Sequence, residues 1–152
     1  MLNSINLIIL NAAKIAGVSG QLLLAICNHE SMNFKFNYSP IDKKSPSYGY
    51  CQLKYETAVQ MGFNGKSEDL LKTTINAKYS AKYLKYQLDR YQGNVLKSVA
   101  AYNSGTYFES KKNPGCPKNL EYVKKVKRLI VERNIAMMLE CDMFTNKFAK
   151  GF

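Results

Sequence analysis

The carboxylate of Glu30 stands out because it ends an otherwise apolar helical face. Leu23, Ile26, Cys27 and Glu30 are spaced i, i+3, i+4 and i+7, which places them on one side of an α-helix. A carboxyl group on a buried face is partly desolvated, which raises its pKa and lets it hold a proton near neutral pH. A general acid requires this property. The alternative is a helix-end carboxylate bonded to nearby backbone or lysine.

The chain has a single histidine, His29, which excludes most other catalytic sites. His29-Glu30 begins like the zinc motif H-E-x-x-H, but position 33 is Asn33, so the second ligand is missing. The sequence contains no G-x-S-x-G motif, and Cys27, two positions before His29, would point elsewhere on a helix. Carboxylate chemistry remains, and we interpret Glu30 as an acid that cleaves glycosidic bonds. We expect no metal and no other cofactor.

The elements that must position Glu30 are predicted to be helices. Ser19 is a suitable N-cap for the Glu30 helix, and segment 33–50, rich in Ser, Asn, Pro and Gly, is predicted to be a loop. Further helices are predicted at about 5–16, 52–61, 74–91, 95–104 and 120–140, with a second loop at 106–119. No stretch alternates with period two. We therefore predict an all-α or mainly α domain.

The first helix is predicted to lie in the core because its apolar residues keep helical spacing. They are Ile5, Ile8, Ile9, Ala12, Ala13 and Ala16. This segment has no positive n-region and no small-residue cleavage site, so we expect no signal peptide. The longest uncharged run, 15–28, is too short and too interrupted by glycine for a membrane span.

Length and composition predict one domain, 1–152, which we expect to be a monomer. The formal net charge of +11 favours an anionic partner, either nucleic acid, an acidic membrane face or a wall polymer. Cys27, Cys51, Cys116 and Cys141 show neither a C-x-x-C pair nor a spacing typical of zinc sites. Buried free thiols are favoured, and disulfides remain possible in an oxidising compartment.

Five short motifs follow one another with suitable gaps between about 15 and 126. They are Glu30-Ser31, Gly49-Tyr50-Cys51-Gln52-Leu53, Asn76 to Leu84, Ala101-Tyr102-Asn103-Ser104-Gly105 and Tyr122-Val123. Their order resembles the soluble lytic transglycosylase (SLT) domain, a lysozyme-like family that cleaves peptidoglycan. The resemblance implies a compact α+β lysozyme-like domain in which Glu30 ends a core helix lining a glycan cleft.

The resemblance also implies roles for residues of the first two motifs. Glu30 is implied to be the catalytic acid and base, and Ser31 supports it as the second member of the family's Glu-Ser pair. Gly49 lets the backbone approach the glycan and Gln52 hydrogen-bonds sugar groups, although an ordinary turn glycine and a solvated glutamine are the alternatives. Tyr50 stands where the family usually has leucine, which alters the cleft wall.

The later motifs imply a second group of site residues. The hydroxyl of Tyr102 is expected to reach Glu30, and Asn103 is expected to contact substrate. Tyr102 also lies on an apolar helical face, so a core tyrosine is its alternative. Tyr122 is expected to support the site. Ser80 replaces a family glycine and Lys118 a family acid, which bears on the glycan-peptide preference.

The implied reaction is cleavage of the β-1,4 bond between N-acetylmuramic acid and N-acetylglucosamine, with formation of 1,6-anhydromuramic acid. A goose-type lysozyme that hydrolyses this bond, with Asp42 positioning water, is one alternative. The other is a non-catalytic basic module for nucleic acid or envelope polymers, suggested by the lysine-rich segment 124–128.

Peptidoglycan strands and anionic envelope polymers are the expected partners. No nucleic acid is expected, because basic and aromatic residues do not interleave in a known nucleic-acid motif. Because no leader is visible, we expect a bacteriophage lysis or virion enzyme that acts in the cell wall or periplasm. A bacterial protein carried by a specialised secretion apparatus is the alternative.

Overall fold

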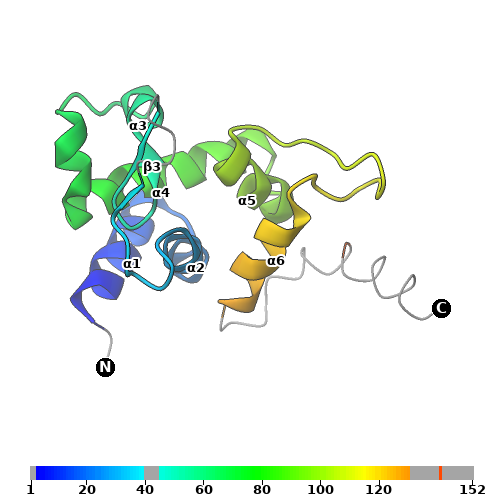
Figure 1. Ribbon diagram of the computed structural model, residues 1–152, viewed down its shortest axis with the longest axis horizontal. Helices are drawn as coiled ribbons and strands as arrows, with labels where there is room; N and C mark the ends of the chain where they lie inside the picture. Colours follow the sequence, from blue (N-terminus) through cyan, green and yellow to red (C-terminus); the bar gives the residue numbers. More distant parts are fainter. Residues whose placement is uncertain (1–2, 40–44, 131–140, 142–152) are drawn as a thin grey trace. The chain divides into compact units, whose positions relative to one another are not determined.

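The structure is a computed structural model that describes residues 3–39, 45–130 and 141. It divides the chain into two compact units, residues 1–86 and 87–152. Helices predominate in each unit, and a small sheet accompanies them in the first (Figure 1). The prediction of a mainly α fold is thus confirmed, and the single domain 1–152 stays a prediction. Within the described residues, no helix is both long and apolar enough to cross a membrane.

Unit 1 carries the Glu30 helix and the elements around it. They are α1 (Ser4–Ala16), α2 (Gly20–Glu30), α3 (Tyr55–Gln60), the 3-10 helix η1 (Ser67–Leu71) and α4 (Thr73–Arg90), whose last turn falls in unit 2. Gly17 ends α1 in the left-handed region at φ 74°, and the Ser19 hydroxyl accepts the Leu22 N–H at 3.2 Å to begin α2. The predicted cap is thus confirmed.

Helices α1 and α2 pack against each other in unit 1 (Figure 1). Ile9 and Ala13 of α1 are fully buried. Ile8 and Ala12, which the sequence also assigned to the core, are only half-buried. The prediction of a core helix therefore holds for one of the two apolar rows of α1 and is wrong for the other.

The predicted loop after Glu30 contains a small antiparallel sheet. Its strands are β1 (Tyr38–Ser39), β2 (Ser47–Tyr48) and β3 (Leu53–Lys54), in the order β1-β2-β3. Tyr48 of the central strand pairs with Tyr38 on one side and with Leu53 on the other. The sequence did not predict this sheet, because a strand of two residues is too short to show alternation.

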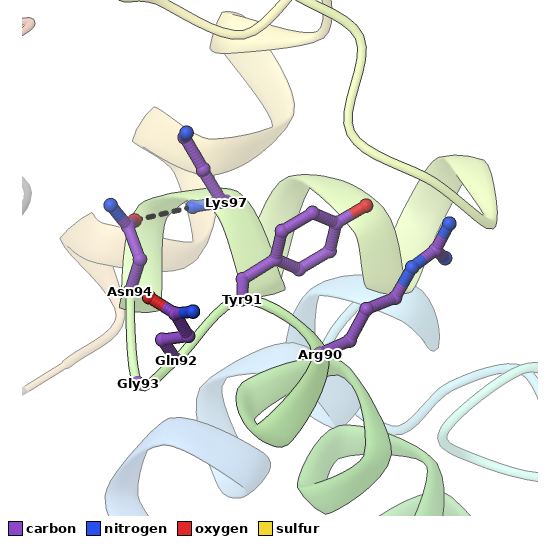
Figure 2. Close-up of a pocket in the computed structure, with 6 residues that line it drawn as sticks. All are labelled: Arg90, Tyr91, Gln92, Gly93, Asn94 and Lys97. Carbon is purple, nitrogen blue, oxygen red and sulfur yellow. Dashed lines mark hydrogen bonds between the residues drawn. The ribbon is translucent and has the colours of Figure 1, made fainter.

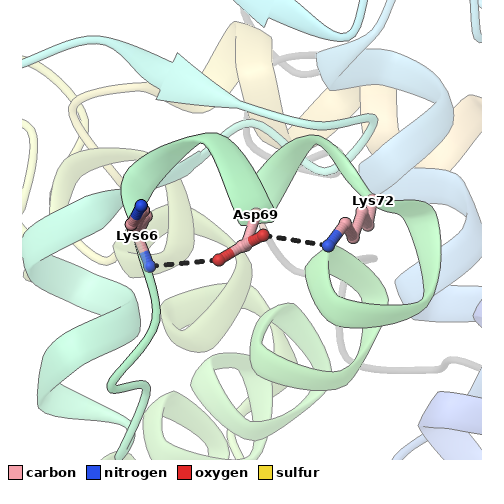
Figure 3. Close-up of polar contacts among 3 residues, drawn as sticks. All are labelled: Lys66, Asp69 and Lys72. Atoms are coloured by element: carbon pink, nitrogen blue, oxygen red, sulfur yellow. Dashed lines mark hydrogen bonds and ion pairs between the residues drawn. The ribbon is translucent and has the colours of Figure 1, made fainter.

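Helix η1 was also not predicted from the sequence, and one carboxylate stabilises it. Asp69 accepts the backbone N–H of Lys66 at 3.2 Å and pairs with the Lys72 ammonium at 2.9 Å (Figure 3). The hydrogen bond from Lys72, and next that from the Lys66 backbone, lower the pKa of Asp69 below its usual value of 3.8.

Unit 2 contains α5 (Val95–Ser104) and α6 (Leu120–Arg128), which pack against each other. Asn94 caps α5 by accepting the Lys97 N–H at 2.9 Å. The predicted last helix begins at Leu120 as expected but ends at Arg128, and positions 131–140 of that prediction lie outside the described residues.

The four cysteines form two disulfides, Cys27–Cys51 in unit 1 and Cys116–Cys141 in unit 2. The preference for free thiols was therefore wrong. Sequence spacing alone could not pair cysteines that lie 24 and 25 residues apart.

Candidate active site

Glu30 is the last residue of α2 and is half-buried. Leu23, Ile26 and Cys27, which share its helical face, are completely buried, as the spacing predicted. The carboxyl group thus lies where the buried face of α2 meets the end of the helix. A carboxyl group at this position is partly shielded from water, which is the environment that a general acid needs.

The chain leaves α2 through a left-handed turn. Met32, Asn33 and Phe34 have φ values of 49°, 63° and 60°, a region that costs an L-residue about 1–2 kcal/mol, somewhat less for asparagine. Such strain persists only where neighbouring contacts hold it, and it is common at functional sites. The N–H of Asn33 bonds to the Asn28 carbonyl at 2.8 Å, which closes the turn back onto α2.

Ser31 anchors this turn. Its side chain is fully buried, and its hydroxyl donates to the Cys27 carbonyl at 2.7 Å and accepts the Phe34 N–H at 3.0 Å. Its backbone carbonyl accepts the N–H groups of Lys35 and Phe36 at 3.0 and 3.1 Å. Ser31 therefore fixes the chain directly after Glu30. This arrangement supports a positioning role, which stays a prediction.

The second motif forms the tight turn between β2 and β3. Gly49 has φ 73° and Gln52 has φ 50°, both in the left-handed region. The Gly49 carbonyl accepts both the backbone N–H of Gln52 at 3.1 Å and its side-chain amide at 2.9 Å. The Gln52 side chain thus stabilises the turn from within, and the expected bond from Gln52 to a sugar stays a prediction. Tyr50, beside Gly49, is half-buried and packs edge-to-face on Phe34 at 5.8 Å.

Asn76 of α4 stabilises this turn through two hydrogen bonds to its backbone. It is 1% exposed, its amide nitrogen donates to the Tyr48 carbonyl at 2.8 Å, and its amide oxygen accepts the Cys51 N–H at 3.0 Å. A Cβ atom at Gly49 would collide with the Asn76 side chain. Gly49 is therefore needed here both for its left-handed backbone and for the close approach of Asn76.

The Cys27–Cys51 disulfide joins the two motifs covalently. It links α2, one turn before Glu30, to the Gly49–Gln52 turn, and the two Cα atoms lie 4.0 Å apart. Unit 1 thus brings Glu30, Ser31, Gly49, Tyr50 and Gln52 into one neighbourhood. Sequence reasoning missed the disulfide, and it named Asn76 only as the start of the third motif, because the contacts of both depend on segments that are distant in the sequence.

The remaining predicted residues lie in unit 2. Tyr102 and Asn103 belong to α5, where Tyr102 is 6% exposed and Asn103 is exposed. The side-chain amide oxygen of Asn103 accepts a hydrogen bond from the side-chain amide nitrogen of Asn119 at 3.0 Å. Asn119 directly precedes α6, which carries the half-buried Tyr122. That these residues act together with Glu30 stays a prediction.

Two other expectations concern carboxylates and metals. Asp42, the possible second carboxylate, lies outside the described residues. In the part of the chain that the structure describes, no group of three or more His, Cys, Asp and Glu residues is placed to hold a metal ion.

Unit 2 also has a basic hollow of about 470 Å³ where α4 ends and α5 begins (Figure 2). Arg90 on its rim donates to the Gly105 carbonyl at 3.1 Å and to the Thr106 hydroxyl at 2.9 Å. Burial alone would raise the pKa of Tyr91, but hydrogen bonds with Thr106 and Tyr107 and the charges of Arg90 and Lys97 lower it. The hydrogen bonds of Arg90 and Tyr91 fix the start of the loop after α5, so we assign these residues a structural role.

These features define a lysozyme-like helical fold that presents a glutamate at the end of a core helix. Residues 8–119 match the family model of the transglycosylase SLT domain, and the chain belongs to that family. In fold it is similar to an inactive mutant of the lytic transglycosylase Slt from Pseudomonas aeruginosa, with a TM-score of 0.56 and 24% identity. The match covers 64% of this chain but only 16% of Slt, which is a much longer protein.

Proposed function

We propose that this chain is a peptidoglycan lytic transglycosylase with Glu30 as its catalytic acid and base. The observation that carries the proposal is the position of Glu30, half-buried at the end of a core helix in a chain of the SLT family. The C-terminal end of a helix carries partial negative charge, which disfavours an ionised carboxylate there and favours the protonated acid. The Gly49–Gln52 turn and Ser31 are proposed to position the glycan and the acid.

The proposed reaction uses one carboxyl group twice. Glu30 first protonates the bridging oxygen between N-acetylmuramic acid and N-acetylglucosamine as that bond breaks. The resulting carboxylate then removes the proton of the muramic acid 6-hydroxyl, whose oxygen attacks the anomeric carbon and closes the 1,6-anhydro ring. No water is consumed. The substrate's own N-acetyl group stabilises the positive anomeric centre, so no nucleophilic carboxylate is needed. Tyr102, Asn103 and Tyr122 are proposed to support these steps.

The two disulfides support an extracytoplasmic place of action, because such bonds form and persist in oxidising compartments. Peptidoglycan lies in such a compartment. The net charge of +11 is proposed to retain the protein on anionic envelope polymers, so high salt should weaken its binding to purified sacculi. The bacteriophage origin expected from the sequence stays a prediction.

Mass analysis of digested sacculi tests the proposal. Wild-type protein should release muropeptides that end in 1,6-anhydromuramic acid. Glu30→Gln should lose this activity by about 10²–10⁴-fold, the usual contribution of a general acid–base residue. Glu68→Gln is the matched control, because it neutralises an exposed carboxylate on η1 and should retain activity.

Three results would contradict parts of the proposal. Products that end in reducing muramic acid would favour hydrolysis, and a loss of activity in Asp42→Asn would then support the lysozyme alternative. Unchanged activity in Glu30→Gln would remove the catalytic assignment. Binding to sacculi without any cleavage would favour a non-catalytic envelope-binding module.

A further inference from the structure

Helix α1 carries a second, mainly apolar face that the core covers only in part. Its first face, with Ile9 and Ala13, is completely buried. The second face lines a hollow of about 480 Å³, and Ile15 on it is 79% exposed. The residues of this second face are spaced i, i+3, i+4, i+7 and i+8, and they are Ile8, Asn11, Ala12, Ile15 and Ala16.

Helix α4 forms the opposite wall of this hollow, which we call the α1–α4 groove. The wall consists of Thr74, Lys78 and Lys82, one residue from each successive helical turn. The ammonium groups of Lys78 and Lys82 lie 5.4 and 5.1 Å from the centre of the Tyr79 ring, which is a cation–π arrangement. All three wall residues are exposed.

The charges on the two helical segments that line the groove all have the same sign. Residues 4–16 of α1 and 73–86 of α4 contain Lys14, Lys78, Lys82 and Lys85 and no aspartate or glutamate. The groove therefore combines an apolar floor with a positive wall. A ligand that matches it must present apolar side chains flanked by negative charge.

We propose that the α1–α4 groove is a docking site for an acidic amphipathic helix of a partner protein. Ile8 and Ile15 lie seven residues apart on α1, about 10.5 Å along the helix axis, which matches two turns of a bound helix. A helix bound in this way inserts apolar anchors at i, i+3, i+4 and i+7 and places acidic residues against Lys78 and Lys82. This docking is independent of the catalytic proposal, because α1 carries none of the proposed site residues.

Two other occupants fit the groove less well. A bilayer surface is flat on this scale and would leave a hollow between two helices unfilled, whereas inserted side chains would fill it. A second copy of this chain would bring the same lysines and a net charge of +11 to the contact, which is like-charge juxtaposition.

The test uses the full-length protein and two synthetic helical peptides. The acidic peptide has leucine at i, i+3, i+4 and i+7 with glutamate on the flanking positions, and its counterpart carries lysine in place of glutamate. Fluorescence anisotropy should give at least about tenfold tighter binding of the acidic peptide. Amide shifts in NMR spectra should locate the bound peptide at Ile8, Ala12 and Ile15.

Variants separate the groove from the general charge of the molecule. Lys78→Glu with Lys82→Glu should weaken binding of the acidic peptide at least about fivefold, since two ion pairs become repulsions. Lys111→Glu with Lys112→Glu, exposed on a loop of unit 2, changes the net charge equally and should have a much smaller effect. Ala12→Arg fills the groove and should abolish binding while peptidoglycan digestion continues.

The proposal is overturned if both peptides bind equally, or if the two double variants weaken binding to the same extent. It is also overturned if vesicles of phosphatidylglycerol bind in a Lys78- and Lys82-dependent way while the acidic peptide does not. If light scattering shows that the wild type is a dimer and that Ala12→Arg is a monomer, the groove is instead a site of self-association. If Ala12→Arg does not fold, the lysine double variant decides the matter.

Discussion

Replacing Gly49 by alanine is expected to destabilise the protein far more than the same change at Gly62. Both glycines have a positive φ, 73° at Gly49 and 94° at Gly62. A Cβ atom at Gly62 meets nothing within 4 Å, whereas one at Gly49 collides with the Asn76 side chain. Gly62→Ala therefore measures the backbone strain alone, about 1–2 kcal/mol.

The additional cost at Gly49 comes from the hydrogen bonds that Asn76 makes. If the new methyl group displaces Asn76, the buried Cys51 N–H loses its partner at about 1–3 kcal/mol, and the part-buried Tyr48 carbonyl loses its partner at about 1 kcal/mol. Gly49→Ala should thus cost roughly 3–6 kcal/mol in total. Asn76→Ala should cost roughly 3–5 kcal/mol, because it leaves the same two groups unsatisfied and opens a small cavity.

A double-mutant cycle measured by urea denaturation checks this account. In the Asn76→Ala background the collision no longer exists, so Gly49→Ala should cost only what Gly62→Ala costs in the wild type. The coupling free energy between Gly49 and Asn76 should therefore be about 2–4 kcal/mol. Unchanged m-values would show that the variants alter stability and not the unfolded chain.

Additive free energies in this cycle would refute the reasoning. Equal costs for Gly49→Ala and Gly62→Ala in the wild type would refute it as well, because then only the backbone conformation would matter. Either result would remove Asn76 as the support of the turn that carries Gln52.

Three further predictions concern the same unit. Replacing Cys27 and Cys51 by alanine should lower the free energy of unfolding by about 3–4 kcal/mol, because the unfolded chain gains entropy when the loop is no longer closed. Denaturation of this variant is compared with that of the wild type, with and without reductant. Ser31→Ala should cost about 1–2 kcal/mol, because the part-buried Phe34 N–H loses its partner while the Cys27 carbonyl keeps the Ser31 backbone N–H, and a cost near zero in the same assay would contradict the anchoring role of Ser31. The pKa of Asp69 in the folded protein lies below its usual value of 3.8. The ionised Asp69 carboxylate therefore stabilises the fold fully above about pH 3.8, and this stabilisation is lost as the pH falls through the lowered pKa. Thermal melts between pH 6 and pH 2.5 should show this loss in the wild type and less of it in Lys72→Met.

The sequence predicted the helices well, because their apolar faces and caps are local signals. The bounds expected for α1, α2, α4 and α5 agree with the structure to within one or two residues. The strands and η1 were missed, since elements of two to five residues carry too little periodicity. The second apolar face of α1 was misassigned because helical spacing shows which residues share a face and not what covers that face.

The candidate site was predictable for the residues that stand in motifs and not for the contacts that position them. Glu30 was recognisable because a carboxylate on an apolar face is unusual. Asn76 begins the third motif, but its role could not be predicted, because a buried asparagine looks like a solvated one until the backbone groups that it bonds are known. The Cys27–Cys51 pair depends on a fold that brings distant segments together, which spacing cannot show.

Polar anchors, more than apolar packing, determine the local shape of this site. Three left-handed residues follow Glu30, and two more, Gly49 and Gln52, are the first and last residues of the second turn. Apolar packing alone would not favour these backbone conformations. Ser31 holds the first segment and Asn76 holds the second, each through a fully or almost fully buried side chain with two directed hydrogen bonds. Because such bonds are costly to leave unmade, they specify one backbone geometry where hydrophobic contacts would tolerate several. A fixed backbone in these two segments would suit the role proposed for Glu30, which must protonate one oxygen and then deprotonate another without moving far.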